Sequence, residues 1–273
     1  MGKPARRLEV ITRRPAGPAH PTPLLFVHGA FIGAWCWDEH FLPFFAERGF
    51  TAHALSLSGH GGSDGRAELD SLKIADYVRD VLQVVNTLDR PPVLIGHSMG
   101  GFVVQKVLEH ADCPAAALLC AVPPRGLAPA AMGLLMQQPG LLWTLNRVLA
   151  GHAPDAASVR DGLFHQPVDE ARLDAFLARC QPESLRAIWD MTAFDLPHPQ
   201  LEHRPPMLVL GTAQDRLIPP SEAHSTAAAW GVEAEIFEGF GHALMLEANW
   251  PLVAERLADW LLQTLPPASG NTA

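Results

Sequence analysis

The sequence predicts an α/β fold, namely a mostly parallel twisted sheet of about seven to eight strands with helices on both faces. Short runs rich in Val, Ile, Leu and Phe alternate along the chain with longer segments of helical period. Most of these runs are too apolar to alternate between polar and apolar residues, which is typical of strands buried on both faces. The 273 residues and the hydrophobic content of 48% are enough for a substantial core.

Seven of the expected strands can be placed at individual apolar runs. They cover residues 8–12, 24–28, 51–57, 93–97, 116–122, 207–211 and 234–238. Helices are expected between them, over 37–48, 71–88, 100–109, 220–230 and 250–263. Because parallel neighbours need a long crossover, this alternation favours parallel pairing.

The alternation breaks once, between residues 123 and 206. No convincing strand is found there, whereas 127–150, 156–164, 170–179 and 183–194 all have helical period. We therefore expect residues 125–203 to form a helical cap, inserted after the sixth strand. Residues 1–124 and 204–273 are expected to form the core.

Composition argues against several classes of partner. The net charge of −9, with no cluster of Lys and Arg longer than a pair, argues against nucleic acid. No apolar run reaches the length of a signal peptide or a membrane helix, so a cytoplasmic location is expected. The sequence leaves the oligomeric state undetermined.

Metal and cofactor motifs are not found in the sequence. There is no HExxH pair, phosphate loop or dinucleotide fingerprint, so we expect neither a metal nor a cofactor. Four cysteines show no CxxC spacing and are expected to be free thiols, mostly packed in the interior: Cys36, Cys113, Cys120 and Cys180.

One serine is a candidate nucleophile because of the turn in which it lies. Ser98 is the centre of GHSMG, directly after the predicted strand 93–97 and before a predicted helix. A strand, a sharp turn and a helix in this order expose a serine for attack on a carbonyl. Such a tight turn leaves no room for a Cβ atom on either side, so both flanking glycines, Gly96 and Gly100, are expected to be sterically required.

A serine also needs a base and an acid that orients the base. His242 ends the glycine-rich turn GFGH after the strand 234–238 and is the candidate base. Asp215 follows the strand 207–211 and is the candidate acid, since the end of the preceding strand offers no carboxylate. We therefore predict a catalytic triad of Ser98, Asp215 and His242.

Acyl transfer further requires backbone N–H groups that stabilise the developing oxyanion. Met99 follows the serine at a helix N-terminus and is one candidate, and Ala30 in the loop HGAF is the other. Candidate contacts for a hydrophobic substrate, and in the case of Arg125 for a carboxylate, are Phe31, Arg125, Met136 and Trp143.

Five separated motifs carry a resemblance to a known family. They are HGAF at 28–31, SGHGGSDG at 58–65, GHSMGG at 96–101, GTAQDRLIP at 211–219 and GHALMLE at 241–247. Together they make the chain similar to the serine hydrolases of the α/β-hydrolase fold, which include esterases and lipases. The resemblance implies oxyanion-hole roles for Ala30 and Met99. The stretch HGAFIGAWCWDEH at 28–40 also resembles plant methylesterases and hydroxynitrile lyases.

The leading expectation is hydrolysis of carboxylic esters of small to medium hydrophobic substrates through an acyl-enzyme on Ser98. One alternative is a C–C bond hydrolase of a diketone or dienone acid, which needs a cationic site for the carboxylate. Arginines of the predicted cap could supply that site: Arg125, Arg160, Arg172 or Arg179. A cofactor-free perhydrolase would use the same three catalytic residues.

Other activities on this fold are less favoured. Haloalkane dehalogenases and epoxide hydrolases of the family use an aspartate nucleophile, whereas this chain has Ser98. Hydroxynitrile lyases add a lysine near the catalytic histidine, and the nearest lysine in the sequence is Lys106. A non-catalytic ligand-binding protein is disfavoured because all three triad positions are filled.

Overall fold

The computed structural model describes residues 5–152, 155–200 and 203–267. Its seven-stranded sheet has the order β1-β3-β2-β4-β5-β6-β7, and only β1 runs antiparallel to its neighbour. The mostly parallel sheet predicted from the apolar runs is therefore confirmed. Its strands are β1 (Val10–Arg13), β2 (Leu24–Val27), β3 (Ala52–Leu55), β4 (Val93–His97), β5 (Ala116–Leu119), β6 (Met207–Thr212) and β7 (Ala234–Phe237).

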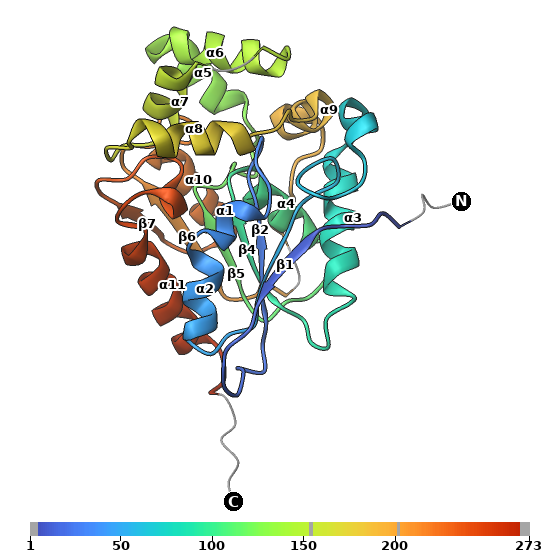
Figure 1. The fold of residues 1–273 in the computed structure, drawn as a ribbon. Helices are drawn as coiled ribbons and strands as arrows, with labels where there is room; N and C mark the ends of the chain where they lie inside the picture. Colours follow the sequence, from blue (N-terminus) through green and yellow to red (C-terminus); the bar gives the residue numbers. More distant parts are fainter. Residues whose placement is uncertain (1–4, 153–154, 201–202, 268–273) are drawn as a thin grey trace, which may run out of the picture.

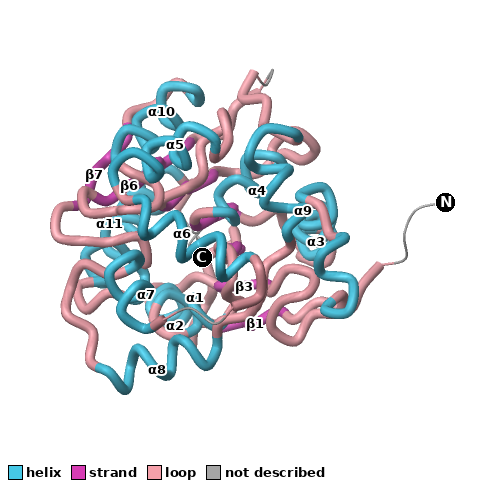
Figure 2. The backbone as a smooth tube through the Cα atoms, turned by 90° about the horizontal axis from the view of Figure 1, so that it is seen from above, coloured by secondary structure: helices cyan, strands magenta, loops and turns pink. Residues whose placement is uncertain are grey.

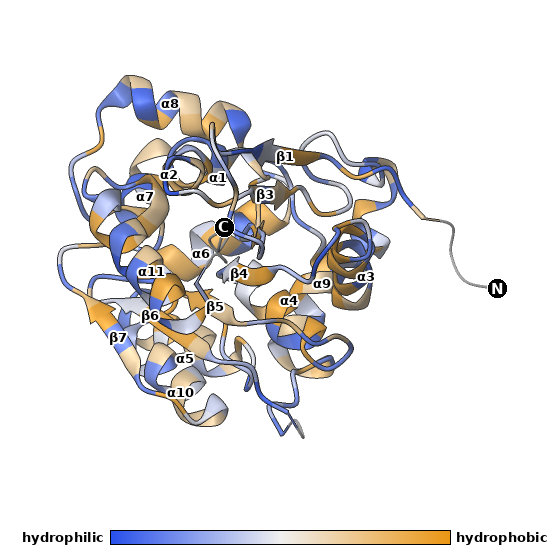
Figure 3. Ribbon diagram, turned by 90° about the horizontal axis from the view of Figure 1, so that it is seen from below, coloured by the Kyte–Doolittle hydropathy of each residue, from blue (hydrophilic) through white to orange (hydrophobic). Residues whose placement is uncertain are grey.

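Helices cover both faces of the sheet (Figure 1). One face carries α1 (Trp35–Asp38), α2 (Phe41–Glu47) and α11 (Trp250–Thr264), and the other carries α3 (Ile74–Val85), α4 (Met99–Val107) and α10 (Pro220–Trp230). Alternate residues of β2 pack into the two layers, since Phe26 faces the first and Val27 the second. Figure 3 shows hydrophobic residues concentrated on β5 and α4, at the centre of the molecule.

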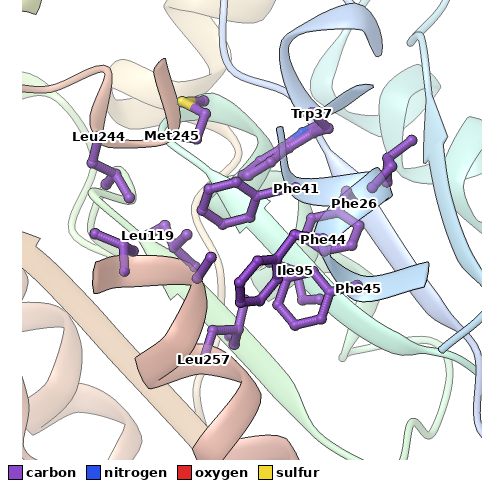
Figure 4. Close-up of a cluster of buried hydrophobic side chains, with 14 of the residues drawn as sticks. Phe26, Trp37, Phe41, Phe44, Phe45, Ile95, Leu119, Leu244, Met245 and Leu257 are labelled. Atoms are coloured by element: carbon purple, nitrogen blue, oxygen red, sulfur yellow. The ribbon is translucent and has the colours of Figure 1, made fainter. Parts of the chain in front are cut away.

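An aromatic cluster fixes the start of α1 and α2 against the sheet (Figure 4). The rings of Trp37 and Phe45 lie 5.0 Å and 5.6 Å from that of Phe26, centroid to centroid, and all three side chains are fully buried. Aromatic pairs at these distances add to the free energy gained by burial. The cluster therefore anchors both ends of the loop between β2 and α1, which contributes to the candidate site.

Proline divides two segments that the sequence analysis predicted as single helices. The segment 37–48 is α1 followed by α2, because Pro43 has no N–H to bond back to residue 39. The segment 127–150 is α5 (Ala128–Gln137) followed by α6 (Pro139–Leu149). Gln138, directly before Pro139, has φ −143° and ψ 61°, which ends the first helix.

The segment 125–203 contains helices and no strand among its described residues, and it is called the cap segment below. It follows β5, which is the fifth strand of the described chain and not the sixth. After α5 and α6 come α7 (Ala156–Leu163), α8 (Glu170–Arg179) and α9 (Leu185–Trp189), which continues as a π-helical turn, Asp190–Phe194. Asp155, Asp169 and Ser184 cap the N-termini of α7, α8 and α9 with their side chains.

The cap segment lies over one end of the sheet. Figure 1 shows α5 to α8 above the strands, and in Figure 2, seen from above, α6 crosses the middle of the molecule. In the part of the chain that the structure describes, no helix is both long and apolar enough to cross a membrane.

Candidate active site

Ser98 lies in a strained turn between β4 and α4. Its φ of 53° and ψ of −119° are rarely adopted by a residue other than glycine and are kept only where the surroundings impose them. A Cβ atom at Gly96 would lie 2.5 Å from the carbonyl oxygen of Gly100, and one at Gly100 would collide with the carbonyl oxygens of Val27 and His28. The predicted steric requirement for both glycines is therefore confirmed.

Asp215 and His242 meet at the ends of two neighbouring strands. Asp215 follows β6, His242 follows β7, and Nδ1 of the imidazole lies 2.7 Å from Oδ2 of the carboxylate. The other oxygen, Oδ1, accepts hydrogen bonds of 2.8 Å from the N–H groups of Leu217 and Ile218. Both side chains are buried, with exposed fractions of 6% for His242 and 0% for Asp215. The carboxylate is thus fixed from both sides and holds one nitrogen of the imidazole.

A cavity of about 520 Å³ lies between the sheet and the cap segment, with Ser98 and His242 on its wall. The loop after β2 contributes Gly29, Ala30 and Phe31. Helices α6, α7 and α8 contribute mainly apolar side chains, which include Leu141, Leu145, Val148, Val159, Leu163, Phe176 and Leu177. Among the described residues, no Asp, Glu, Lys or Arg lines this cavity. Its chemistry suits an uncharged, apolar molecule held next to a serine and a histidine.

The two predicted backbone donors and the predicted contact Phe31 have different positions relative to the cavity. Ala30 and Phe31 line the cavity together with Ser98. Met99 is the first residue of α4, directly after Ser98, and its side chain is buried in the core and does not line the cavity.

Three other predicted substrate contacts do not line the cavity. Arg125 donates two hydrogen bonds to the carboxylate of Glu222, of 3.0 Å and 2.7 Å. Met136 and Trp143 point to solvent, with exposed fractions of 78% and 68%. The structure therefore corrects the expectation that these three side chains contact the substrate.

The spacing of apolar residues in α6 explains why Trp143 lies outside the cavity. Leu141, Leu145 and Val148 follow the spacing i, i+4, i+7 and form the face that lines the cavity. Trp143 lies two residues after Leu141 and thus faces away from it. The i, i+4, i+7 spacing is visible in the sequence and identifies the face of α6 that lines the cavity. The large size of a side chain such as that of Trp143 does not indicate which face it lies on.

The remaining candidate cations also lie outside the cavity and have other partners. Arg172 donates to the carbonyl oxygen of Leu246 at 2.7 Å, and Arg179 pairs with Glu39 at 2.9 Å. Arg160 lies next to Asp161 and is 42% exposed. The nearest lysine in the sequence, Lys106, is 2.9 Å from Asp195 and 3.2 Å from Glu109.

His97 supports the candidate base, a role that the sequence analysis missed. Its Nε2 lies 2.9 Å from the carbonyl oxygen of His242, to which it donates a hydrogen bond. Burial holds the pKa of His97 well below its ordinary value, so the ring is neutral. The space beside its Nδ1 is limited by the loop after β2, since a Cβ atom at Gly29 would lie 2.9 Å from that nitrogen.

One group of described side chains has the composition of a metal site. The donor atoms of Cys120, Asp215 and His242 lie within 4.8 Å of one another. However, Asp215 and His242 are already hydrogen-bonded to each other. Burial, together with the nearby Asp215 carboxylate, also raises the pKa of the Cys120 thiol well above its ordinary value. Since metal ions bind the thiolate, this group fits a metal ion poorly.

All four cysteines are free thiols, as expected from their spacing in the sequence.

Comparison with known proteins identifies the family. A model of the alpha/beta hydrolase family matches residues 24–256, and the chain therefore belongs to this family. Solved structures of similar fold include an esterase from Exiguobacterium antarcticum, with a TM-score of 0.70 and 17% identity over 94% of this chain and 96% of that one. Another is a monoacylglycerol lipase from Paleococcus ferrophilus, with a TM-score of 0.69 and 16% identity over 95% and 100%.

Curated relatives match shorter parts of the chain. A pyrethroid hydrolase from Sphingobium wenxiniae is 30% identical over 89 residues, which are 33% of this chain and 31% of that protein. Methylesterase 2 from Arabidopsis thaliana is 35% identical over 31% of this chain and 33% of its own length. A non-heme chloroperoxidase from Streptomyces lividans is 36% identical over 40% of both chains. The chain thus matches about a third to two fifths of the length of these relatives.

Proposed function

We propose that the protein hydrolyses carboxylic esters of uncharged, small to medium hydrophobic substrates, with residues 125–203 acting as a cap over the bound ester. The observation that carries the proposal is an apolar cavity with Ser98 and His242 on its wall and Asp215 hydrogen-bonded behind the imidazole. The methylesterase and pyrethroid hydrolase among the relatives also support a hydrolase.

In the proposed mechanism, Oγ of Ser98 attacks the ester carbonyl while Nε2 of His242 takes the hydroxyl proton. Asp215 holds the Nδ1–H of that ring and stabilises the imidazolium that forms. The N–H groups of Ala30 and Met99 bind the oxyanion. His242 then protonates the leaving alcohol, and a water molecule deprotonated by His242 releases the acid from Ser98.

The other activities considered are less well supported by the cavity. A C–C hydrolase of a dienone acid needs a cation next to the substrate carboxylate, and no Arg or Lys of the described residues lines the cavity. A lyase that uses a lysine is disfavoured for the same reason, since Lys106 pairs with Asp195 and Glu109.

Perhydrolysis is the second candidate, because a non-heme chloroperoxidase is among the relatives. Hydrogen peroxide would replace water in attacking the acyl-enzyme, and a peracid would leave. Peroxide-dependent bromination in acetate buffer, lost in Ser98→Ala, would reveal this reaction.

Turnover of p-nitrophenyl butyrate tests the leading proposal. We expect the wild-type protein to release p-nitrophenol and to gain one fluorophosphonate adduct in its intact mass. Ser98→Ala should lose both properties, and His242→Ala should lose at least 1,000-fold in kcat, roughly as in other triads. Unchanged turnover in folded Ser98→Ala would refute the mechanism.

A further inference from the structure

A buried carboxylate of the cap segment lies next to the loop that carries Ala30. Glu183 is 4% exposed and directly precedes Ser184, the N-cap of α9. Its Oε2 accepts a hydrogen bond of 3.4 Å from the N–H of Phe31, the residue after Ala30. We propose that Glu183 is a positioning residue of the oxyanion hole, an inference that rests on the proposed esterase function.

The backbone of Phe31 is held by the cap segment on both of its polar groups. Besides the bond from its N–H to Glu183, its carbonyl oxygen accepts a hydrogen bond of 2.8 Å from the N–H of Gln181. Phe31 has φ 67°, a value that a non-glycine residue keeps only when its surroundings impose it. These two bonds lie one residue from the N–H group assigned to the oxyanion, so they determine where that group points.

Three other groups hold the Glu183 carboxylate in place. Oε1 accepts hydrogen bonds of 2.6 Å from the hydroxyl of Tyr77 and 2.8 Å from the N–H of Ser184. Oε2 lies 3.1 Å from Nε2 of His60, which is fully buried in the loop after β3. The pKa of His60 is raised and that of Glu183 is lowered, each by the charge of the other against the effect of burial, so the two form an ion pair.

Stability alone does not account for this ion pair. Removing two charges from water is costly, and apolar residues of similar volume often give an equally stable protein. An apolar side chain, however, offers no acceptor for the N–H of Phe31. Glu183 supplies that acceptor, and the Ser184 N–H and His60 hold its carboxylate even without the Tyr77 hydroxyl.

Two variants distinguish two roles of Glu183. One role is to position the backbone of Phe31, and the other is only to attach the cap segment to the core. In Glu183→Gln, the amide oxygen can still accept from Tyr77 and Ser184, but an NH₂ group replaces the acceptor of the Phe31 N–H. Tyr77→Phe is the matched control. It removes a hydrogen bond to the same carboxylate and leaves the acceptor of Phe31 in place.

The experiment compares kcat, KM, the inhibition constant of a phenylboronic acid and the thermal midpoint of each variant. The boronate forms a tetrahedral anion on a serine nucleophile and therefore reports on the oxyanion hole. We expect Glu183→Gln to lower kcat by about 30- to 100-fold, somewhat less than the roughly 100- to 1,000-fold known for outright loss of an oxyanion donor, because the N–H of Ala30 is displaced and not removed. Its KM should stay within about twofold, and the boronate constant should rise by the same factor as kcat falls. Tyr77→Phe should keep kcat within about threefold, even where its thermal midpoint falls.

Equal losses of kcat in the two variants, or an unchanged kcat in Glu183→Gln, would overturn the inference. If Glu183→Gln unfolds at the assay temperature, the double variant His60→Gln with Glu183→Gln, which removes both buried charges together, replaces it. The same loss of kcat is expected for this double variant, with Tyr77→Phe kept as the control. Failure of the proposed function has a different signature, because the wild-type protein would then neither hydrolyse the ester nor gain the fluorophosphonate adduct.

Discussion

The two oxygens of the Asp215 carboxylate have different partners, and the imidazole of His242 is bound by only one of them. Oδ2 lies 2.7 Å from Nδ1 of His242, whereas Oδ1 accepts from the N–H groups of Leu217 and Ile218. One oxygen therefore fixes the loop after β6 and the other orients the ring. A substitution that changes only the second oxygen separates these two effects.

Asp215→Asn is that substitution. Its amide oxygen can still accept from Leu217 and Ile218, while its NH₂ group faces Nδ1 of His242. The imidazole then carries its proton on Nε2 and cannot accept one from Ser98. We expect kcat for p-nitrophenyl butyrate to fall by about 1,000- to 10,000-fold with little change in thermal stability. A folded variant that retains a tenth of the wild-type kcat would show that Asp215 does not control the tautomer.

The sheet could be predicted from sequence because its signal is local. Each parallel strand is a short run of apolar residues, and Val93–His97 matches the predicted range in full. Helix boundaries were less accurate where proline removes a donor, as at Pro43 and Pro139.

Local turns made Ser98, Asp215 and His242 recognisable, but contacts between distant segments left no such signal. Glu183 lies 106 residues from Tyr77, and neither belongs to a motif that brings them together. Only the fold places the start of α9 against α3 and the loop after β2. The lining of the cavity depends equally on which face of α6 turns inward.

Gly29 limits how closely the loop after β2 can approach Ser98. A Cβ atom there would lie 2.9 Å from Nδ1 of His97 and 3.1 Å from Cβ of Ser98. We expect Gly29→Ala to displace the loop and to lower kcat by at least about tenfold, since small misplacements are costly in acyl transfer. The measurement is kcat and KM for p-nitrophenyl butyrate.

Gly133→Ala is the control for that variant. Gly133 lies inside α5, and a Cβ atom added there would have no neighbour within 4 Å among the described residues outside the helix backbone. Alanine should therefore stabilise the helix by up to about 1 kcal/mol and leave kcat unchanged. Equal kcat values in Gly29→Ala and Gly133→Ala would contradict the tight approach of the loop to Ser98.

Chain-length preference should depend on the inward face of α6. Leu145 lines the cavity, so Leu145→Trp should fill part of it and exclude longer acyl groups. We expect kcat/KM for p-nitrophenyl octanoate to fall at least tenfold relative to that for the acetate, because each methylene kept from the cavity loses about 0.8 kcal/mol of burial. Trp143→Ala, on the exposed face of the same helix, should leave this ratio within about twofold. A ratio that changes in Trp143→Ala and not in Leu145→Trp would show that Trp143, and not Leu145, contacts the acyl group.

Acid should destabilise the folded protein through His28. The ring is fully buried, its Nε2 accepts from the N–H of Leu57 at 3.0 Å, and its Nδ1 donates to the carbonyl oxygen of Gly29 at 2.7 Å. Burial, and to a lesser extent repulsion from His60, lowers its pKa to about 3. The unfolded chain takes up a proton below about pH 6.5 and the folded chain does not. The free energy of unfolding should therefore fall by about 1.4 kcal/mol per pH unit from this residue between pH 6.5 and its folded pKa.

His28→Gln isolates that contribution, because glutamine offers one donor and one acceptor but does not titrate. Urea unfolding at pH 7, 6 and 5 should give a wild-type stability that falls more steeply than that of the variant, by about 1.4 kcal/mol for each unit below pH 6.5. Other buried groups, including His97, contribute equally to both proteins and cancel in the difference. His110→Gln, at an exposed position, should follow the wild type. Parallel curves for the wild type and His28→Gln would mean that His28 can be protonated in the folded state.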